Sequence, residues 1–136
     1  MTIQSELGGG GTVSKTNVGY AETGASNLLK HFGVIGGDIV TAEQQGRPPM
    51  QLMQFKDETC YVMSPDEGLF EPFFELGDPC NPGEPIGQVH YPHHVEKTPW
   101  LVHATCEGTV LSKRPPGIVR RGDNVAIIAQ AMDGAG

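Results

Sequence analysis

The stretch Gly68-Leu69-Phe70-Glu71-Pro72-Phe73-Phe74-Glu75-Leu76-Gly77-Asp78 decides the fold, because its pattern recurs later in the chain. A glycine opens each copy and a Gly-Asp turn follows it. In the later copy, Gly108-Thr109-Val110 precedes Arg121-Gly122-Asp123. An apolar strand comes after each turn, at Ile86 to Val89 and at Val125 to Ala129. This weak repeat predicts two similar β units that interleave around one core.

Short strands and frequent turns extend on both sides of this repeat. Nineteen glycines and 11 prolines among 136 residues favour turns over long helices. We expect strands at residues 60–63, 68–73, 86–90, 100–104, 108–111 and 124–129. The predicted class is therefore mainly β with an N-terminal strand and helix, an α+β chain. Residues 46–136 resemble a barrel-sandwich hybrid of the biotinyl/lipoyl type.

Carrier domains of that type present a modified lysine on the hairpin between the two halves, commonly within Met-Lys-Met. The corresponding residues 92–99 contain only Lys97, within Glu-Lys-Thr, and both methionines are missing. A structural domain of the same topology is the favoured hypothesis, and a swinging-arm carrier is the alternative.

The N-terminal part of the chain has a different pattern. Residues 1–7 alternate as a short strand would, and the glycines at 8–11 then allow a sharp turn. Thr12 or Ser14 is placed to cap a helix, which Gly33 would end. Its apolar stripe consists of Val18, Ala21, Ala25, Leu28, Leu29 and Phe32. A polar connector follows, and we place the domain boundary near residue 45, giving domains 1–45 and 46–136.

The charge balance bears on the partners of the chain. Nine basic against 16 acidic residues leave a net charge of −7, which would repel a nucleic acid. The one basic cluster (Lys113, Arg114, Arg120, Arg121) is interpreted as a solvated hairpin, with phosphate recognition as the alternative. No apolar run approaches the length of a membrane helix, and the first residues do not resemble a signal peptide. We expect a cytoplasmic protein with no membrane partner.

Cysteines and histidines are the remaining candidates for metal chemistry. Cys60, Cys80 and Cys106 are odd in number and lack CxxC spacing, so all three are interpreted as free thiols. Four histidines lie close together in sequence, His90, His93, His94 and His103. Adventitious surface binding of a metal is the favoured hypothesis there, and a true metal site is the alternative.

Glu6 is the strongest catalytic candidate. It ends the predicted strand, just before the glycine turn and the helix N-terminus, where α/β folds place reacting groups. On position alone, a solvated or capping carboxylate is the favoured interpretation.

Three segments together resemble one known family. They are Ser5-Glu6-Leu7-Gly8-Gly9-Gly10-Gly11-Thr12, the helix end Asn27-Leu28-Leu29-Lys30-His31-Phe32-Gly33-Val34, and the tail pattern of Gly87-Gln88-Val89-His90-Tyr91-Pro92, Gly108-Thr109-Val110-Leu111 and Arg121-Gly122-Asp123. They resemble the C-terminal part of the succinylglutamate desuccinylase/aspartoacylase family, and within it the N-acetyl-diaminobutyrate deacetylases of ectoine breakdown. Members are zinc-dependent amidohydrolases of N-acyl amino acids with a carboxypeptidase-like catalytic domain. The resemblance implies that Glu6 is the general base and that residues 1–45 are the last strand and helix of that domain.

The family's zinc ligands are a His-x-x-Glu pair and a later histidine, all upstream of the strand that carries the base. No such pair precedes Glu6 here. We therefore expect a C-terminal piece of such an enzyme, which alone binds no zinc and is inactive. The alternative is a free-standing β module for protein–protein association. Such a module would dock through its helix on a partner protein or on a second copy of itself, as a homo-oligomer.

Overall fold

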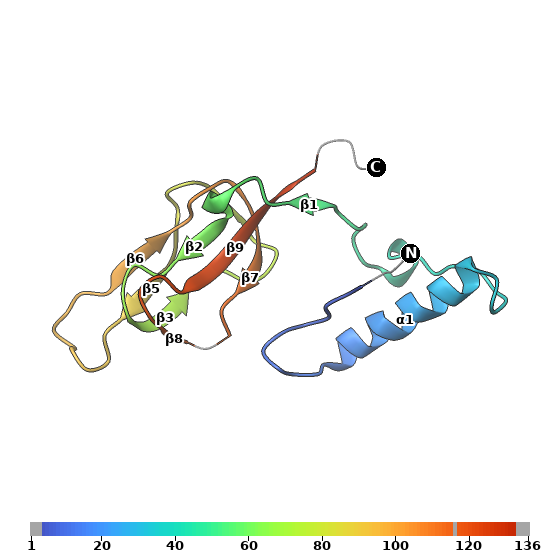
Figure 1. Cartoon of the computed structure of the whole chain (residues 1–136), viewed down its shortest axis with the longest axis horizontal. Helices are drawn as coiled ribbons and strands as arrows, with labels where there is room; N and C mark the ends of the chain where they lie inside the picture. Colours follow the sequence, from blue (N-terminus) through green and yellow to red (C-terminus); the bar gives the residue numbers. More distant parts are fainter. Residues whose placement is uncertain (1–3, 116, 133–136) are drawn as a thin grey trace. The chain divides into compact units, whose positions relative to one another are not determined.

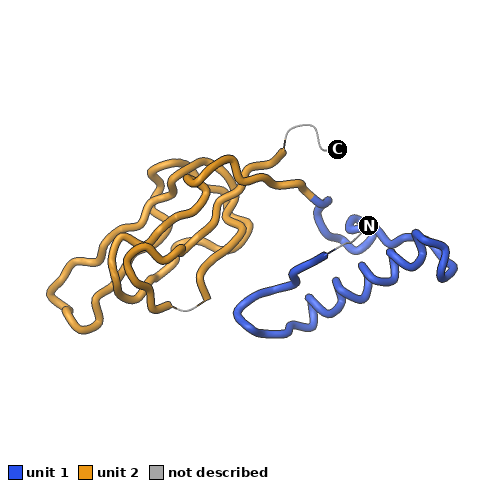
Figure 2. Tube along the Cα trace, in the orientation of Figure 1, with its two compact units in different colours: residues 1–50 blue, residues 51–136 orange. Residues whose placement is uncertain are grey.

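The computed structural model describes residues 4–115 and 117–132. The chain forms two compact units, residues 1–50 and residues 51–136, drawn in two colours in Figure 2.

The first unit is built on one helix, α1 (Lys15–His31). Ser14 caps it, because its side chain accepts a hydrogen bond from the Asn17 N–H at 3.1 Å. The Phe32 N–H closes the last turn onto the Leu28 carbonyl, and Gly33 then leaves the helix at a φ of 68°. Both predicted helix boundaries are confirmed. A short 3₁₀ helix (Glu43–Gln45) follows later in this unit.

The segment after α1 lies along one flank of the helix. The Asn27 side chain bonds both backbone groups of Val40, accepting from its N–H at 2.9 Å and donating to its carbonyl at 2.7 Å. Further along, the Arg47 guanidinium stacks 4.5 Å from the centre of the Tyr20 ring. These contacts are polar, and none of the described residues 4–50 is buried. The apolar stripe of α1 therefore has no core to enter within this unit.

The second unit consists of two antiparallel sheets, seen in Figure 1. Among the described residues, one sheet has five strands in the order β1-β9-β7-β4, with β2 also paired to β9. The other has four strands in the order β6-β5-β3-β8. The bounds are β1 (Met53–Gln54), β2 (Tyr61–Met63), β3 (Gly68–Pro72), β4 (Pro79–Cys80), β5 (Pro85–His90), β6 (Trp100–His103), β7 (Gly108–Lys113), β8 (Ile118–Val119) and β9 (Asn124–Ala131).

The two halves of the repeat exchange strands between these sheets. β8, from the second half, pairs with β3 of the first, while β4, from the first half, pairs with β7 of the second. Both sheets contribute fully buried valines to one core, including Val89 from β5 and Val110 from β7. The predicted interleaving around a shared core is thus observed, and the chain is mainly β with one helix.

The repeat is also visible in the backbone. Gly68 and Gly108 open β3 and β7 at φ values of 156° and 155°. A Cβ at Gly68 would lie 2.2 Å from the His90 carbonyl oxygen, and one at Gly108 would lie 2.4 Å from that of Ala129. Each glycine is therefore required because a neighbouring strand passes too close for a side chain.

The two Gly-Asp turns match as well. In each turn the aspartate side chain accepts from a backbone N–H three residues earlier, at 2.8 Å from Glu75 to Asp78 and at 2.9 Å from Arg120 to Asp123. The preceding glycines, Gly77 and Gly122, both have positive φ.

Two sequence predictions differ from the structure. Residues 4–7, the described part of the strand predicted at 1–7, form no strand, because none of the described residues lies beside them as a pairing partner. The two-residue strands β1, β4 and β8 were not predicted.

The unit boundary lies between Met50 and Gln51. Within the described residues, α1 is too short and too polar to span a bilayer.

Candidate functional site

Glu6, the predicted base, lies in an exposed irregular segment that runs into the glycine turn. Thr12 closes that turn by donating from both its N–H and its hydroxyl to the Gly9 carbonyl, at 3.4 and 3.1 Å. Two neighbours of Glu6, Ser5 and Leu7, line a hollow on α1, but Glu6 itself does not. Glu6 is exposed, and its carboxylate is therefore accessible to a reactant.

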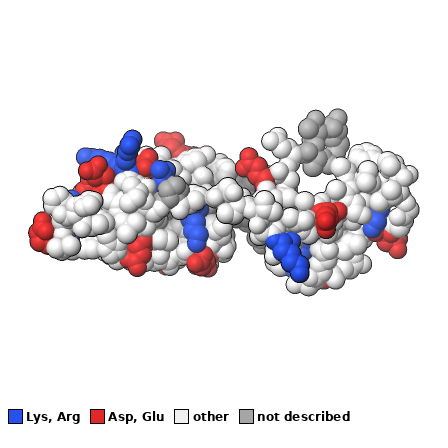
Figure 3. Space-filling model, turned by 90° about the horizontal axis from the view of Figure 1, so that it is seen from below, with Lys and Arg blue, Asp and Glu red and all other residues white. Residues whose placement is uncertain are grey.

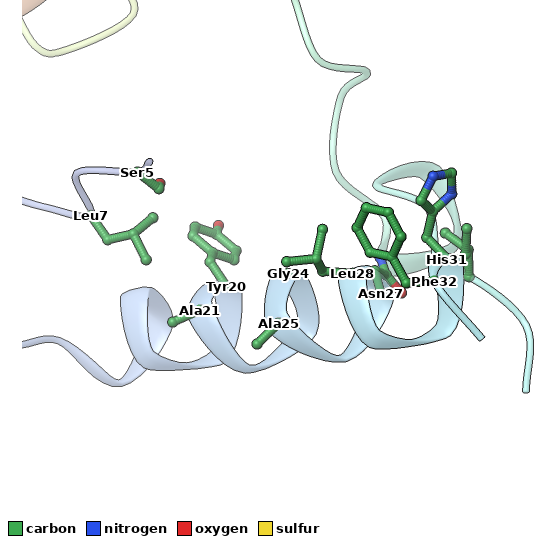
Figure 4. Close-up of a pocket in the computed structure, with 11 residues that line it drawn as sticks. Ser5, Leu7, Tyr20, Ala21, Gly24, Ala25, Asn27, Leu28, His31 and Phe32 are labelled. Atoms are coloured by element: carbon green, nitrogen blue, oxygen red, sulfur yellow. The ribbon is translucent and has the colours of Figure 1, made fainter. Parts of the chain in front are cut away.

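The hollow has a volume of about 600 Å³ and lies entirely within the first unit. We call it the α1 hollow. Figure 4 shows Tyr20, Leu28 and Phe32 projecting from one side of the helix, opposite Leu7. Leu28 and Phe32 are 38% and 61% exposed. Because its lining is mainly apolar, the α1 hollow suits a protein surface better than a charged ligand.

The structure places His103 at the far end of the β5–β6 hairpin from His90, while His93 and His94 stay together in the loop after His90. His90 ends β5, and its Nε2 lies 2.6 Å from the Glu71 carboxylate, which also accepts from Gln88 at 2.7 Å. These two bonds, the one from Gln88 first, lower the pKa of Glu71. His93 and His94 are in the β5–β6 loop, and His103 ends β6.

Sequence reasoning missed one His-x-x-Glu spacing, from His93 to Glu96, which stands downstream of Glu6. It could have been found by scanning the whole chain. In the structure His94 is the histidine near Glu96, with 3.6 Å between its Nδ1 and the carboxylate. The part of the chain that the structure describes holds no group of three His, Cys, Asp or Glu side chains able to bind a metal. The described residues therefore do not fit a zinc site.

Lys97 lies in the hairpin where carrier domains present their modified lysine, and its ammonium group contacts two neighbouring side chains. Its Nζ lies 2.9 Å from the Asp66 carboxylate and 3.4 Å from the centre of the Tyr91 ring. The Tyr91 hydroxyl donates to the same carboxylate at 3.0 Å. The bond from Lys97, followed by those from the Glu67 N–H and Tyr91, lowers the pKa of Asp66 to about 2. These contacts favour the structural domain over the swinging-arm carrier.

The basic cluster is partly neutralised. Lys113 pairs with Glu75 at 2.7 Å, and Arg114 pairs with Asp123 at 3.0 Å. On the face shown in Figure 3, acidic and basic groups of the second unit lie next to one another. This arrangement favours the solvated hairpin over phosphate recognition.

No family model matches the chain. It is 31% identical over 134 residues to the N-alpha-acetyl-L-2,4-diaminobutyric acid deacetylase of Halomonas elongata, a match that spans 98% of this chain and 38% of that protein.

Solved structures agree. A succinylglutamatedesuccinylase/aspartoacylase from Rhodobacter sphaeroides superimposes with a TM-score of 0.85 and 35% identity, covering 96% of this chain and 40% of the other. The product-bound ectoine utilization protein EutE of Ruegeria pomeroyi gives a TM-score of 0.80 and 30% identity, over 92% of this chain and 36% of the other. The chain therefore spans well under half the length of each of these relatives.

Proposed function

Because the chain belongs, as a partial-length relative, to the succinylglutamate desuccinylase/aspartoacylase family, we propose that it is part of a deacylase of N-acyl amino acids. The observation that carries this proposal is the match to a deacetylase along almost the whole of this chain. The proposed substrate is a small N-acylated amino acid, and the reaction is hydrolysis of its amide bond. The second unit would be the barrel-sandwich hybrid that accompanies the catalytic domain.

We assign Glu6 the role of general base. A carboxylate can accept a proton from the attacking water and pass it to the departing amine, and such transfers typically contribute 10²–10⁴-fold to a rate. The exposed position of Glu6 beside the glycine turn leaves it open to a reactant. Because the described residues do not fit a zinc site, the ligands of the family's zinc would have to come from other residues.

The apolar flank of α1 supports the view that this chain is a part. An amphipathic helix gains most of its stability by burying its apolar face. Here Leu28, Leu29 and Phe32 remain exposed within their own unit. We propose that the rest of the catalytic domain packs on this flank and fills the α1 hollow.

A second function is favoured by the same flank. If the chain acts as a free-standing module, α1 docks on another protein or on a second copy of itself. The two proposals differ in what restores activity. A deacylase part needs the missing catalytic residues, whereas a module gains no hydrolytic activity from them.

The test is a chimera in which this chain replaces the matched 38% of the Halomonas elongata deacetylase. We expect it to deacetylate N-acetyl-diaminobutyrate, while this chain alone does not. Glu6→Gln should lower kcat of the chimera by about 10²-fold or more. Glu22→Gln, an exposed change on α1, is the matched control and should leave kcat unchanged.

Two results would count against the assignment of Glu6. One is a chimera whose kcat is unaffected by Glu6→Gln. The other is amide hydrolysis by this chain alone that persists in the Gln variant. A folded chimera with native-like circular dichroism and no activity would favour the association module.

A further inference from the structure

The fold brings all three cysteines to one place, although they are far apart in the sequence. Cys60 ends the 3₁₀ turn Glu58–Cys60, Cys80 lies in β4, and Cys106 lies in the turn before β7. Cys80 Sγ is 4.0 Å from the Cys106 carbonyl oxygen and 3.6 Å from that of Gly108. Sequence reasoning treated these thiols as separate, and the interleaving of the strands makes them neighbours.

Cys60 and Cys106 are the better matched pair. The Thr105 hydroxyl donates to the Thr59 carbonyl, so the residues directly before the two cysteines are hydrogen bonded to each other. Cys60 also lies close enough to Cys106 to raise the pKa of the Cys106 thiol. Cys80, by contrast, directs its sulfur towards backbone carbonyls on the β7 side.

The exposure of the three thiols sets an order of reaction. Cys60 and Cys80 are 1% and 4% exposed, so a reagent in solution cannot reach them directly. Cys106 is only partly buried. An oxidant in solution must therefore react with Cys106 first, and the buried Cys60 is the resolving thiol.

We propose that Cys106 and Cys60 form an intramolecular disulfide by exchange with a low-molecular-weight disulfide. The Cys106 thiolate attacks one sulfur of the reagent, forming a mixed disulfide and releasing one reagent thiolate. Cys60, as its thiolate, then attacks Cys106 Sγ and releases the second. Two protein thiols are oxidised, one reagent disulfide is reduced to two thiols, and the two protons pass to the departing thiolates.

The surroundings of Cys106 make this exchange slow at neutral pH. Burial raises the pKa of Cys106, and the neighbouring Cys60 and Asp57 raise it further, against a smaller opposing effect of Thr59. Burial also raises the pKa of Cys80, assisted by Cys106 and Glu84. Because the thiolate is the nucleophile, the rate should keep rising above pH ~8.5, the ordinary cysteine pKa.

The experiment treats the full chain with oxidised glutathione and maps the products by mass spectrometry. Cleavage at Met63 by cyanogen bromide separates Cys60, in residues 54–63, from Cys80 and Cys106 in residues 64–132. A Cys60–Cys106 bond holds these two fragments together until reductant is added. A Cys80–Cys106 bond lies within one fragment and does not. We expect the fragments to stay linked.

Two variants sharpen the result. Cys80→Ser should form the same linked fragments at the same rate as the natural chain. Cys60→Ser should stop at a stable glutathione adduct on Cys106. The proposal is overturned if the natural chain yields only glutathione adducts, chains joined to one another, or a bond within residues 64–132. Loss of the link in a folded Cys80→Ser variant would overturn it as well.

Discussion

Replacing Gly108 by alanine should be among the most damaging single changes in the second unit. The residue opens β7 at a φ of 155°, a conformation that costs other residues about 1–3 kcal/mol. Its new Cβ would lie 2.4 Å from the Ala129 carbonyl oxygen and 2.9 Å from the Ile128 side chain. Because the first neighbour is backbone of the central strand β9, it cannot rotate away, and overpacking of this kind adds about 1–3 kcal/mol.

Gly122→Ala provides the matched control. Gly122 has a φ of 85°, and a Cβ there would meet nothing within 4 Å. The control therefore carries backbone strain of about 1–2 kcal/mol without the clash. We expect Gly108→Ala to lower the free energy of unfolding by about 2–6 kcal/mol in total, a large part of the ~5–15 kcal/mol that holds an ordinary domain together.

Urea unfolding followed by the fluorescence of Trp100 measures both variants. Trp100 is the single tryptophan of the chain and lies in β6 of the second unit, so its signal reports this unit. If Gly108→Ala and Gly122→Ala cost the same within about 0.5 kcal/mol, the close approach of β9 to β7 is not what requires glycine, and the reasoning fails. Gly68→Ala, at the equivalent position of β3, should behave like Gly108→Ala.

Three further predictions concern acid stability, the helix and its apolar flank. The pKa of Asp66 is about 2 in the folded chain against an ordinary 3.8, so its contribution to stability is present above pH 3.8 and is lost as the pH falls towards 2. Asp66→Asn should therefore make the melting temperature depend less on pH over this interval than it does in the natural chain. Melting temperatures that fall in parallel for the two proteins would contradict this. Gly24→Ala, at an open position of α1, should increase helicity by circular dichroism because alanine is favoured by about 1 kcal/mol, and unchanged helicity would argue against an isolated helix. Leu28→Glu should reduce any self-association seen by light scattering while leaving the Trp100 unfolding curve unchanged; an altered curve would show that α1 supports the second unit.

The helix and most strands could be predicted because their signals are local. Ser14 and Gly33 mark the ends of α1 by their own hydrogen bonds and backbone conformation. The strand β9 follows a Gly-Asp turn and is apolar from Val125 to Ala129, as expected for a strand in the middle of a sheet. The short strands β4 and β8 carry no such signal, because two residues are too few to show a period.

The remaining features depend on residues distant in sequence. Residues 4–7 alternate as a strand should, but a strand is stable only beside a partner, and none of the described residues provides one. The approach of Cys60 to Cys106 follows from the exchange of strands between the two halves, which no local pattern encodes. The role of Glu6 stays a prediction from sequence, and the structure adds only that Glu6 is exposed and is not among the residues that line the α1 hollow.

The two units differ in a way that bears on what the chain can do. Every buried side chain among the described residues belongs to the second unit, where fifteen apolar residues from the two sheets and their connecting segments are buried. The first unit has a well-capped helix with an apolar flank and buries nothing. Caps fix where a helix begins and ends, but they supply only about 1 kcal/mol each, so a stripe of this kind implies a surface that covers it. Ser5 and Leu7, on either side of Glu6, line the α1 hollow, so under the proposed function a surface that fills the hollow would also contact the segment that carries the carboxylate, and catalysis and association would depend on the same partner surface.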